Sequence, residues 1–196
     1  MKLYPDPQAQ ADPQAEALLR FNRDVLDQAL ALVAAHEAPG APPYAQPVGA
    51  HLRHVIEHYE ALLMPARPNE VDYDRRARDA ELESCPGAAR RRLCALQLCL
   101  QHWQEEDLHR PLSLRGQAGL AGEFAFAVES SVGRELVFLA SHAVHHYALL
   151  KLHCQQHGMR IAADFGKAPA TVAHERAALS NTTTKETACT PLAALA

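Results

Sequence analysis

The sequence lacks a long apolar run, and it lacks a strong excess of charge of either sign. No segment approaches the ~20 consecutive apolar residues that a membrane-spanning helix needs, and the first residues contain no apolar signal core. Lysine and arginine number 19 against 23 aspartates and glutamates, for a formal charge of -4, and no basic face is present. We therefore expect a soluble, cytoplasmic protein that binds neither membranes nor nucleic acids.

Paired cysteine motifs are also missing. The five cysteines are odd in number and include no Cys-x-x-Cys pair, which argues against a disulfide framework and a thiolate zinc site. Aromatic residues make up only 6% of the chain, but histidine is abundant: its 12 copies outnumber the five phenylalanines and five tyrosines together. Because the histidines are interspersed among apolar residues, they are not an affinity tag. They are the main candidates for chemistry.

Apolar residues recur with helical spacing in four long stretches, which suits one domain for a chain of this length. Asp12 and Pro13 are typical of a helix start, and Gly158 is typical of a helix end. The pattern predicts long helices over 13–37, 47–64, 87–108 and 130–157, and a short charged surface helix over 72–83. The 87–108 stretch has arginines near its start and acidic residues near its end, opposite to what the helix dipole favours.

The periodicity changes between residues 109 and 129, where apolar residues alternate around three glycines. This alternation predicts a small β-hairpin between the third and fourth long helices. We therefore predict a mainly all-α fold, a four-helix bundle carrying that hairpin. The domain is expected to cover residues 1–176, with at most a short last helix near 164–172, and the Ser/Thr/Ala-rich residues 177–196 are expected to form a disordered tail.

Two groups of histidines lie at helical spacing. At 100° per residue His51, His54 and His58 fall within one narrow arc, and His142 and His146 stand one turn apart. If the helices over 47–64 and 130–157 pack side by side, one histidine of the first group completes a set of three imidazoles. Three neutral imidazoles with an open position suit Zn²⁺, and also Ni²⁺ or Fe²⁺.

The segments 48–58 (VGAHLRHVIEH) and 141–147 (SHAVHHY) resemble the DinB-like (DinB/YfiT) superfamily of metalloproteins. Members of that superfamily are four-helix bundles with one histidine near the start of the second helix and a His-x-x-x-His pair in the last, and the resemblance covers residues 13–157. It implies the ligands His54, His142 and His146, since His54 is followed by Val-Ile-Glu, with His51 and His58 as alternatives. One departure is Tyr147-Ala-Leu, where many members have Arg-Gly-Gln.

The resemblance also implies a function. Several members are metal-dependent transferases that use a low-molecular-weight thiol such as bacillithiol, mycothiol or glutathione, and homodimers are usual. The metal's open position would bind the thiol, and a hydrolase that activates water is chemically equivalent up to that step. Two other hypotheses stay open. One is a non-catalytic, metal-stabilised stress-response or interaction module, in which His51 or His58 closes the site. The other is a metal-free helical interaction protein.

The remaining candidates have plainer roles. His145 is expected to be exposed or hydrogen-bonded, and His153 and His157 to form a partly exposed pair at a helix end. Glu57 and Glu135 could orient the ligands, but we expect both at the surface, and we expect Tyr147 to be packed in the core.

Overall fold

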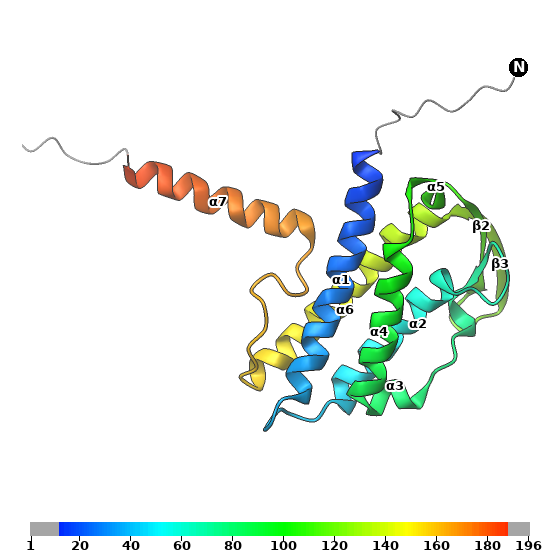
Figure 1. The fold of residues 1–196 in the computed structure, drawn as a ribbon, viewed down its shortest axis with the longest axis horizontal. Helices are drawn as coiled ribbons and strands as arrows, with labels where there is room; N and C mark the ends of the chain where they lie inside the picture. Colours follow the sequence, from blue (N-terminus) through cyan, green and yellow to red (C-terminus); the bar gives the residue numbers. More distant parts are fainter. Residues whose placement is uncertain (1–11, 188–196) are drawn as a thin grey trace, which may run out of the picture.

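The structure, a computed structural model, describes residues 12–187 and is mainly helical with one small sheet (Figure 1). This confirms the predicted fold class at the level of mainly α. The long helices are α1 (Pro13–Glu37), α2 (Ala50–Leu63), α4 (Pro86–Gln101), α6 (Val132–Gln156) and α7 (Pro169–Thr187). The shorter elements are η1 (Ala45–Gly49), β1 (Glu70–Asp72), η2 (Tyr73–Arg75), α3 (Ala80–Ser84), α5 (Glu105–Leu108), β2 (Pro111–Ala118) and β3 (Phe124–Ser131).

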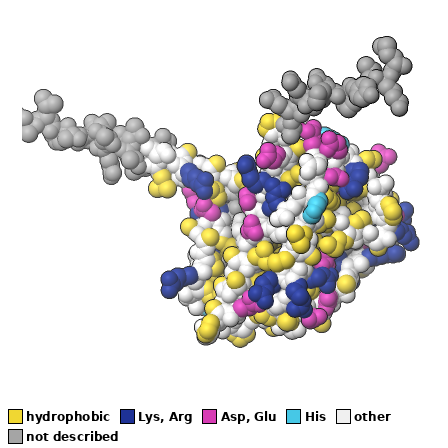
Figure 2. Space-filling view, viewed as in Figure 1, with side chains coloured by type: hydrophobic (Ala, Val, Ile, Leu, Met, Phe, Trp, Pro, Cys, Tyr) yellow, Lys and Arg dark blue, Asp and Glu magenta, His cyan; other side chains and the backbone are white. Residues whose placement is uncertain are grey.

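Helices α1, α2, α4 and α6 surround one apolar core. Helices α1 and α2 each contact both α4 and α6. Each helix contributes fully buried side chains, among them Val25, Ile56, Leu96 and Leu139. The apolar stripes that predicted these helices therefore face one another, and their burial supplies the main driving force for packing. Figure 2 shows basic and acidic side chains interspersed over the visible face, in keeping with the small net charge.

The starts of α1 and α6 follow from their capping residues. The Asp12 carboxylate accepts a hydrogen bond from the Gln14 amide at 2.9 Å, and the Ser131 hydroxyl accepts one from the Arg134 amide at 3.3 Å. These bonds satisfy amides that have no partner inside the helix. Helix α6 ends just before Gly158, which has a φ of +63°, so the predicted bounds of both helices are confirmed to within two residues.

The helix predicted over 87–108 is instead two helices, α4 and α5. Gln104 leaves the helical conformation. Its backbone N–H donates to the Asp107 carboxylate at 2.9 Å and so caps the start of α5. The acidic residues thereby lie in the first turn of α5, where the helix dipole favours them. At the start of α4, Arg90 pairs with Glu37 and Arg92 pairs with Glu60, so neighbouring elements compensate the arginines.

The predicted hairpin is present as β2 and β3, which pair antiparallel with Leu114 opposite Val128. The sheet also contains β1, which joins β2 in parallel with Val71 opposite Leu114. The prediction of a single surface helix over 72–83 was wrong. That stretch begins in β1, turns through η2, and becomes helical only from Ala80 to Ser84, because parallel pairing with β2, a contact remote in sequence, outweighs the local preference.

The last helix is longer than expected. Helix α7 continues to Thr187, whereas we expected a disordered tail from Ala177; residues 188–196 lie outside the described part of the chain. Good helix formers such as Ala177 fill its middle, and Arg176 pairs with Asp164 at 3.1 Å near its start. Figure 1 shows α7 extending away from the other long helices. Among residues 12–187, no helix combines the length and apolar character that crossing a membrane requires.

Candidate metal centre

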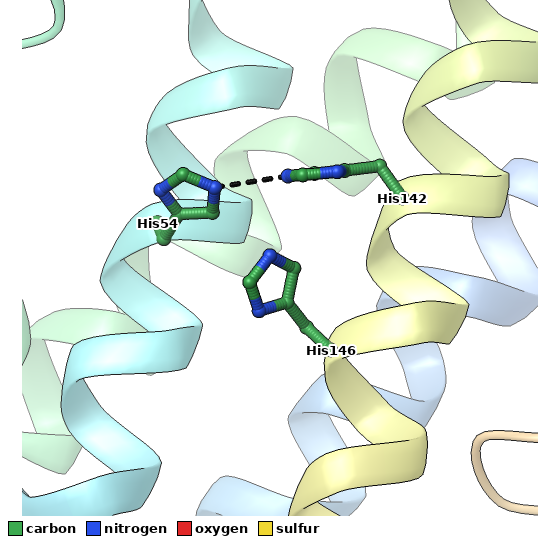
Figure 3. Close-up of side chains that lie close together, drawn as sticks. All are labelled: His54, His142 and His146. Carbon is green, nitrogen blue, oxygen red and sulfur yellow. Dashed lines mark hydrogen bonds between the residues drawn. The ribbon is translucent and has the colours of Figure 1, made fainter. Parts of the chain in front are cut away.

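Helices α2 and α6 lie in contact and bring three predicted ligands together. His54 comes from α2, and His142 and His146 come from successive turns of α6; each is half-buried. Figure 3 shows the three rings converging between the two helices. One potential ligand atom from each ring lies within 4.8 Å of the other two, and the Nε2 atoms of His54 and His142 are 2.9 Å apart.

This spacing fits a metal ion. Zinc–nitrogen bonds are about 2.0–2.1 Å long, so ligand nitrogens around a tetrahedral ion stand about 3.4 Å apart. The 2.9 Å separation of His54 and His142 is somewhat shorter than this value, and no two of the three ligand atoms are more than 4.8 Å apart. The three histidines could therefore hold a divalent metal, and imidazole alone does not select which one.

His51 is adjacent to the group. Its Nδ1 atom lies 2.7 Å from Nδ1 of His146. In Figure 3 one ring nitrogen of His146 points toward the other two histidines and one points away. Because Nδ1 is engaged with His51, the nitrogen that points inward is Nε2. Histidines that bind metals commonly donate their second N–H to another group, and His51 is placed to accept such a bond from His146.

Both ring nitrogens of His58 already have partners. Its Nδ1 lies 2.7 Å from the backbone oxygen of His54, and a carbonyl oxygen only accepts, so Nδ1 carries the hydrogen. Nε2 therefore presents a lone pair, and the guanidinium of Arg76 donates to it at 3.3 Å. With both nitrogens occupied, His58 does not serve as a ligand in this arrangement. Of the alternatives to His54, His51 alone stays open.

The imidazoles of the cluster are neutral at neutral pH. Burial lowers the pKa of His54 to about 3, with the neighbouring histidines and Arg76 acting in the same direction. Burial is also the main cause that lowers the pKa of His58 and of His146, each to about 4. It lowers the pKa of His51 and His142 as well. Neutral imidazole is the form that binds metals, so the site is ready to bind without first releasing protons.

Two aromatic rings border the cluster. Phe138 stacks on His142 with ring centroids 5.4 Å apart, and Tyr73 stacks on His58 at 5.3 Å. The two aromatic rings also touch each other, at 5.5 Å. Neither residue was among the predicted site residues. Phe138 could have been found, since it precedes His142 by one helical turn, whereas nothing in the sequence relates Tyr73 to α6.

Tyr73 is held in place by a buried carboxylate. Its hydroxyl donates to Glu135 at 2.9 Å, and the same carboxylate accepts from the Ser130 hydroxyl at 2.6 Å and from Arg134 at 2.8 Å. The Glu135 side chain is inaccessible to solvent. The expectation of a surface position for Glu135 was therefore wrong, because Tyr73 and Ser130 cover it from outside α6.

Glu57 is likewise buried rather than at the surface. Its carboxylate accepts a hydrogen bond from the Asp79 amide at 2.7 Å and lies 3.8 Å from the Arg76 guanidinium. The chain from β1 to α3 folds back over this side of α2, which the sequence does not reveal. Tyr147 is packed as expected, stacked on Phe165 with centroids 5.3 Å apart.

His145, His153 and His157 behave as predicted. His145 is exposed, with its ring centroid 6.0 Å from that of His146. His153 and His157 form a partly exposed pair with centroids 4.2 Å apart, and Nδ1 of His157 donates to the His153 carbonyl at 2.9 Å.

Comparison with known proteins leaves the family open. No family model matches the chain, and no solved structure matches it. Among curated proteins, FK506-binding protein 5 of Rhizopus delemar is 31% identical to it over 118 residues. This alignment covers 59% of the chain but 31% of the fungal protein, so the chain spans less than a third of the length of the curated relative that it matches.

Proposed function

We propose that this chain is a DinB-like metalloprotein in which His54, His142 and His146 bind a divalent metal, zinc or nickel with iron as a third option. The observation that carries the proposal is the meeting of imidazoles from α2 and α6: His54 and His142, 88 positions apart in sequence, lie 2.9 Å apart in space. An accidental pair of histidines would have no reason to meet a third, yet His146 completes the group.

The arrangement of the long helices supports the DinB-like assignment. The single histidine lies on the second long helix and the pair on the last helix of the packed set α1, α2, α4 and α6, as in that superfamily. On this proposal the four helices form a DinB-like bundle. The superfamily also leads us to propose a homodimer, whose state in solution light scattering would measure.

We further propose that the protein is a metal-dependent thiol transferase that uses a low-molecular-weight thiol. A bound metal would supply a position where a thiol ionises below its free pKa of ~8.5. The chain's own residues would do the rest: three neutral imidazoles would hold the metal, and His51 would orient His146. Phe138 borders the site by stacking on His142, and Tyr73 stacks on the neighbouring His58.

Metal analysis tests the site. Wild type, purified without chelators, is expected to contain a divalent metal by mass spectrometry, and His54→Ala, His142→Ala and His146→Ala are each expected to lose most of it. His157→Ala is the matched control, since that histidine is exposed just past the end of α6 and lies outside the cluster. Metal content in the three ligand variants equal to that of wild type would refute the site.

Thiol conjugation tests the activity. With chlorodinitrobenzene the thiol sulfur bonds to the ring carbon, chloride leaves with the bonding electron pair, and the thiol proton passes to solvent. The metal-loaded wild type should accelerate this reaction and His142→Ala should not. A wild type that holds metal but conjugates no thiol, over a panel of thiols, would instead favour the non-catalytic metal-stabilised module.

Binding of FK506 is a second candidate function. It is favoured by one observation, the 31% identity over 118 residues to a protein named FK506-binding protein 5. Calorimetric titration of FK506 into the purified chain tests it directly, and the absence of binding at micromolar concentrations would exclude it. The His142→Ala variant should bind FK506 as wild type does if the two functions are separate.

A further inference from the structure

Strand β3 exposes a row of large apolar side chains. Phe124, Phe126 and Val128 are 68%, 38% and 50% exposed, respectively. Alternate residues of a strand point to the same face, so these three side chains lie on one face of the hairpin. Exposing two phenylalanines and a valine side by side is costly, which points to a binding role.

The exposed row lies on the same side of the sheet as the histidine cluster. Ser130, the next alternate residue of β3, shares the face of Val128, and its hydroxyl donates to Glu135 on α6. Glu135 also accepts from Tyr73, whose ring contacts both His58 and Phe138. The strand that carries the apolar row is therefore tied, through Ser130 and the buried Glu135, to the aromatic ring of Tyr73 beside the histidines.

A close contact fixes Phe126 next to that surface. A Cβ atom placed on Gly116, opposite Phe126 in β2, would approach the Phe126 ring to 2.7 Å and the Asp74 carboxylate to 3.0 Å. The phenylalanine ring thus lies over the glycine and beside Asp74, whose carboxylate accepts from the Gln117 amide at 2.8 Å. Asp74 directly follows Tyr73, so Phe126 is next to the segment that borders the cluster.

The direction of the hairpin carries the row toward the histidines. Strand β1 is parallel to β2, so β2 runs in the same direction as the chain from Glu70 to Asp72. Beyond that strand the chain continues back along α2, where the Asp79 amide bonds to Glu57, which lies between His54 and His58. The hairpin therefore extends along the histidine-bearing part of α2 instead of away from it.

We propose that Phe126, Val128, Tyr73 and Phe138 form an apolar wall that binds the electrophile of the transferase reaction, a small molecule with an aromatic or similarly flat apolar body. This rests on the proposed function, since the wall borders the metal site. The metal would hold the thiol and the wall would hold its co-substrate. Phe126 and Val128 are then specificity-determining residues, and Tyr73 and Phe138 join the wall to the ligands.

A fluorescent apolar probe, anilinonaphthalene sulfonate, measures the wall without requiring activity. Phe126→Ser and Val128→Ser should each weaken its binding to the whole chain about tenfold, as expected for losing one aromatic or branched side chain from a half-exposed site. Leu149→Ser is the matched control, because Leu149 is 51% exposed on α6 but is not part of the wall. Circular dichroism of each variant checks that the helices are retained.

Metal loading then tests whether wall and site are adjacent. Copper in place of zinc should quench the bound probe in wild type, and His54→Ala, whose ring contacts no residue of the wall, should bind the probe normally but show no quenching. Equal probe binding by Phe126→Ser, Leu149→Ser and wild type would overturn the wall. A wild type that binds no metal would refute the proposed function separately. Probe binding by Phe126→Ser and Leu149→Ser would still show whether the apolar wall is a binding surface.

Discussion

Replacing Tyr73 by Phe should weaken the fold while leaving the metal site intact. The substitution removes one hydroxyl, which donates at 2.9 Å to the Glu135 carboxylate. That carboxylate is fully buried, so water cannot take the place of the lost donor. Hydrogen bonds to buried charged groups contribute about 1.5–3 kcal/mol.

The expected loss lies near the middle of that range. The Ser130 hydroxyl and the Arg134 guanidinium still donate to the other oxygen of Glu135. The carboxylate therefore keeps most of its stabilisation, and Tyr73→Phe should lower the free energy of unfolding by about 2 kcal/mol. For a domain of this size the melting temperature should fall by about 4–8 °C.

Urea unfolding of the metal-free protein, followed by circular dichroism, measures this loss. Tyr73→Phe should shift the midpoint without changing the slope, and its metal content should equal that of wild type, because the ring that stacks on His58 is retained. Tyr73→Ala, which also removes the ring, should be less stable still. A loss below about 0.5 kcal/mol for Tyr73→Phe would show that the buried carboxylate does not depend on this bond.

Three further predictions concern pH, metal and backbone packing. The metal-free protein should lose stability as the pH falls from about 6.5 to about 4. His54, His58 and His146 have lower pKa values in the folded state than in the unfolded state, so the unfolded state binds more protons over this range. Urea midpoints measured against pH test this, and a flat profile would contradict it. Zinc at one hundred times its dissociation constant should stabilise wild type by about 2.7 kcal/mol and His54→Ala hardly at all, as thermal melts would show. Gly49→Ala should destabilise the fold, since the new Cβ would lie 1.9 Å from the Glu83 carbonyl oxygen. Gly40→Ala is the control for backbone strain without a clash, because Gly40 has a φ of +78° and nothing lies within 4 Å of its Cβ position. If Gly49→Ala lowers the free energy of unfolding no more than Gly40→Ala does, the clash is refuted.

Much of the site followed from local rules. Residues four apart on a helix share a face, so the position of His142 one turn from His146 needed no tertiary information. The alternation of apolar residues between 109 and 129 predicted the hairpin for the same reason, since the side chains of a strand alternate between its two faces with a period of two residues. The resemblance favoured His54 over His58 as the partner of the His142–His146 pair. The structure adds a physical reason, because both ring nitrogens of His58 already have hydrogen-bond partners.

Contacts remote in sequence could not be predicted in this way. Tyr73 reaches Glu135 because β1 pairs with β2 and the next residues pass over α2, a route set by strand pairing. The burial of Glu57 has the same origin, since the segment that covers it begins more than a dozen residues later. Neither carboxylate differs in its local sequence from one at the surface.

The sequence by itself determined the helical faces, their capped starts and the histidines that share each face, because these depend on neighbours within about one or two turns. Only the tertiary structure decided that α2 lies against α6, that both ring nitrogens of His58 have hydrogen-bond partners, and that Ser130 of β3 bonds to Glu135 of α6. Those outcomes depend on how separate elements pack to bury their apolar surfaces, and this packing depends on all the elements together and not on any local stretch of sequence.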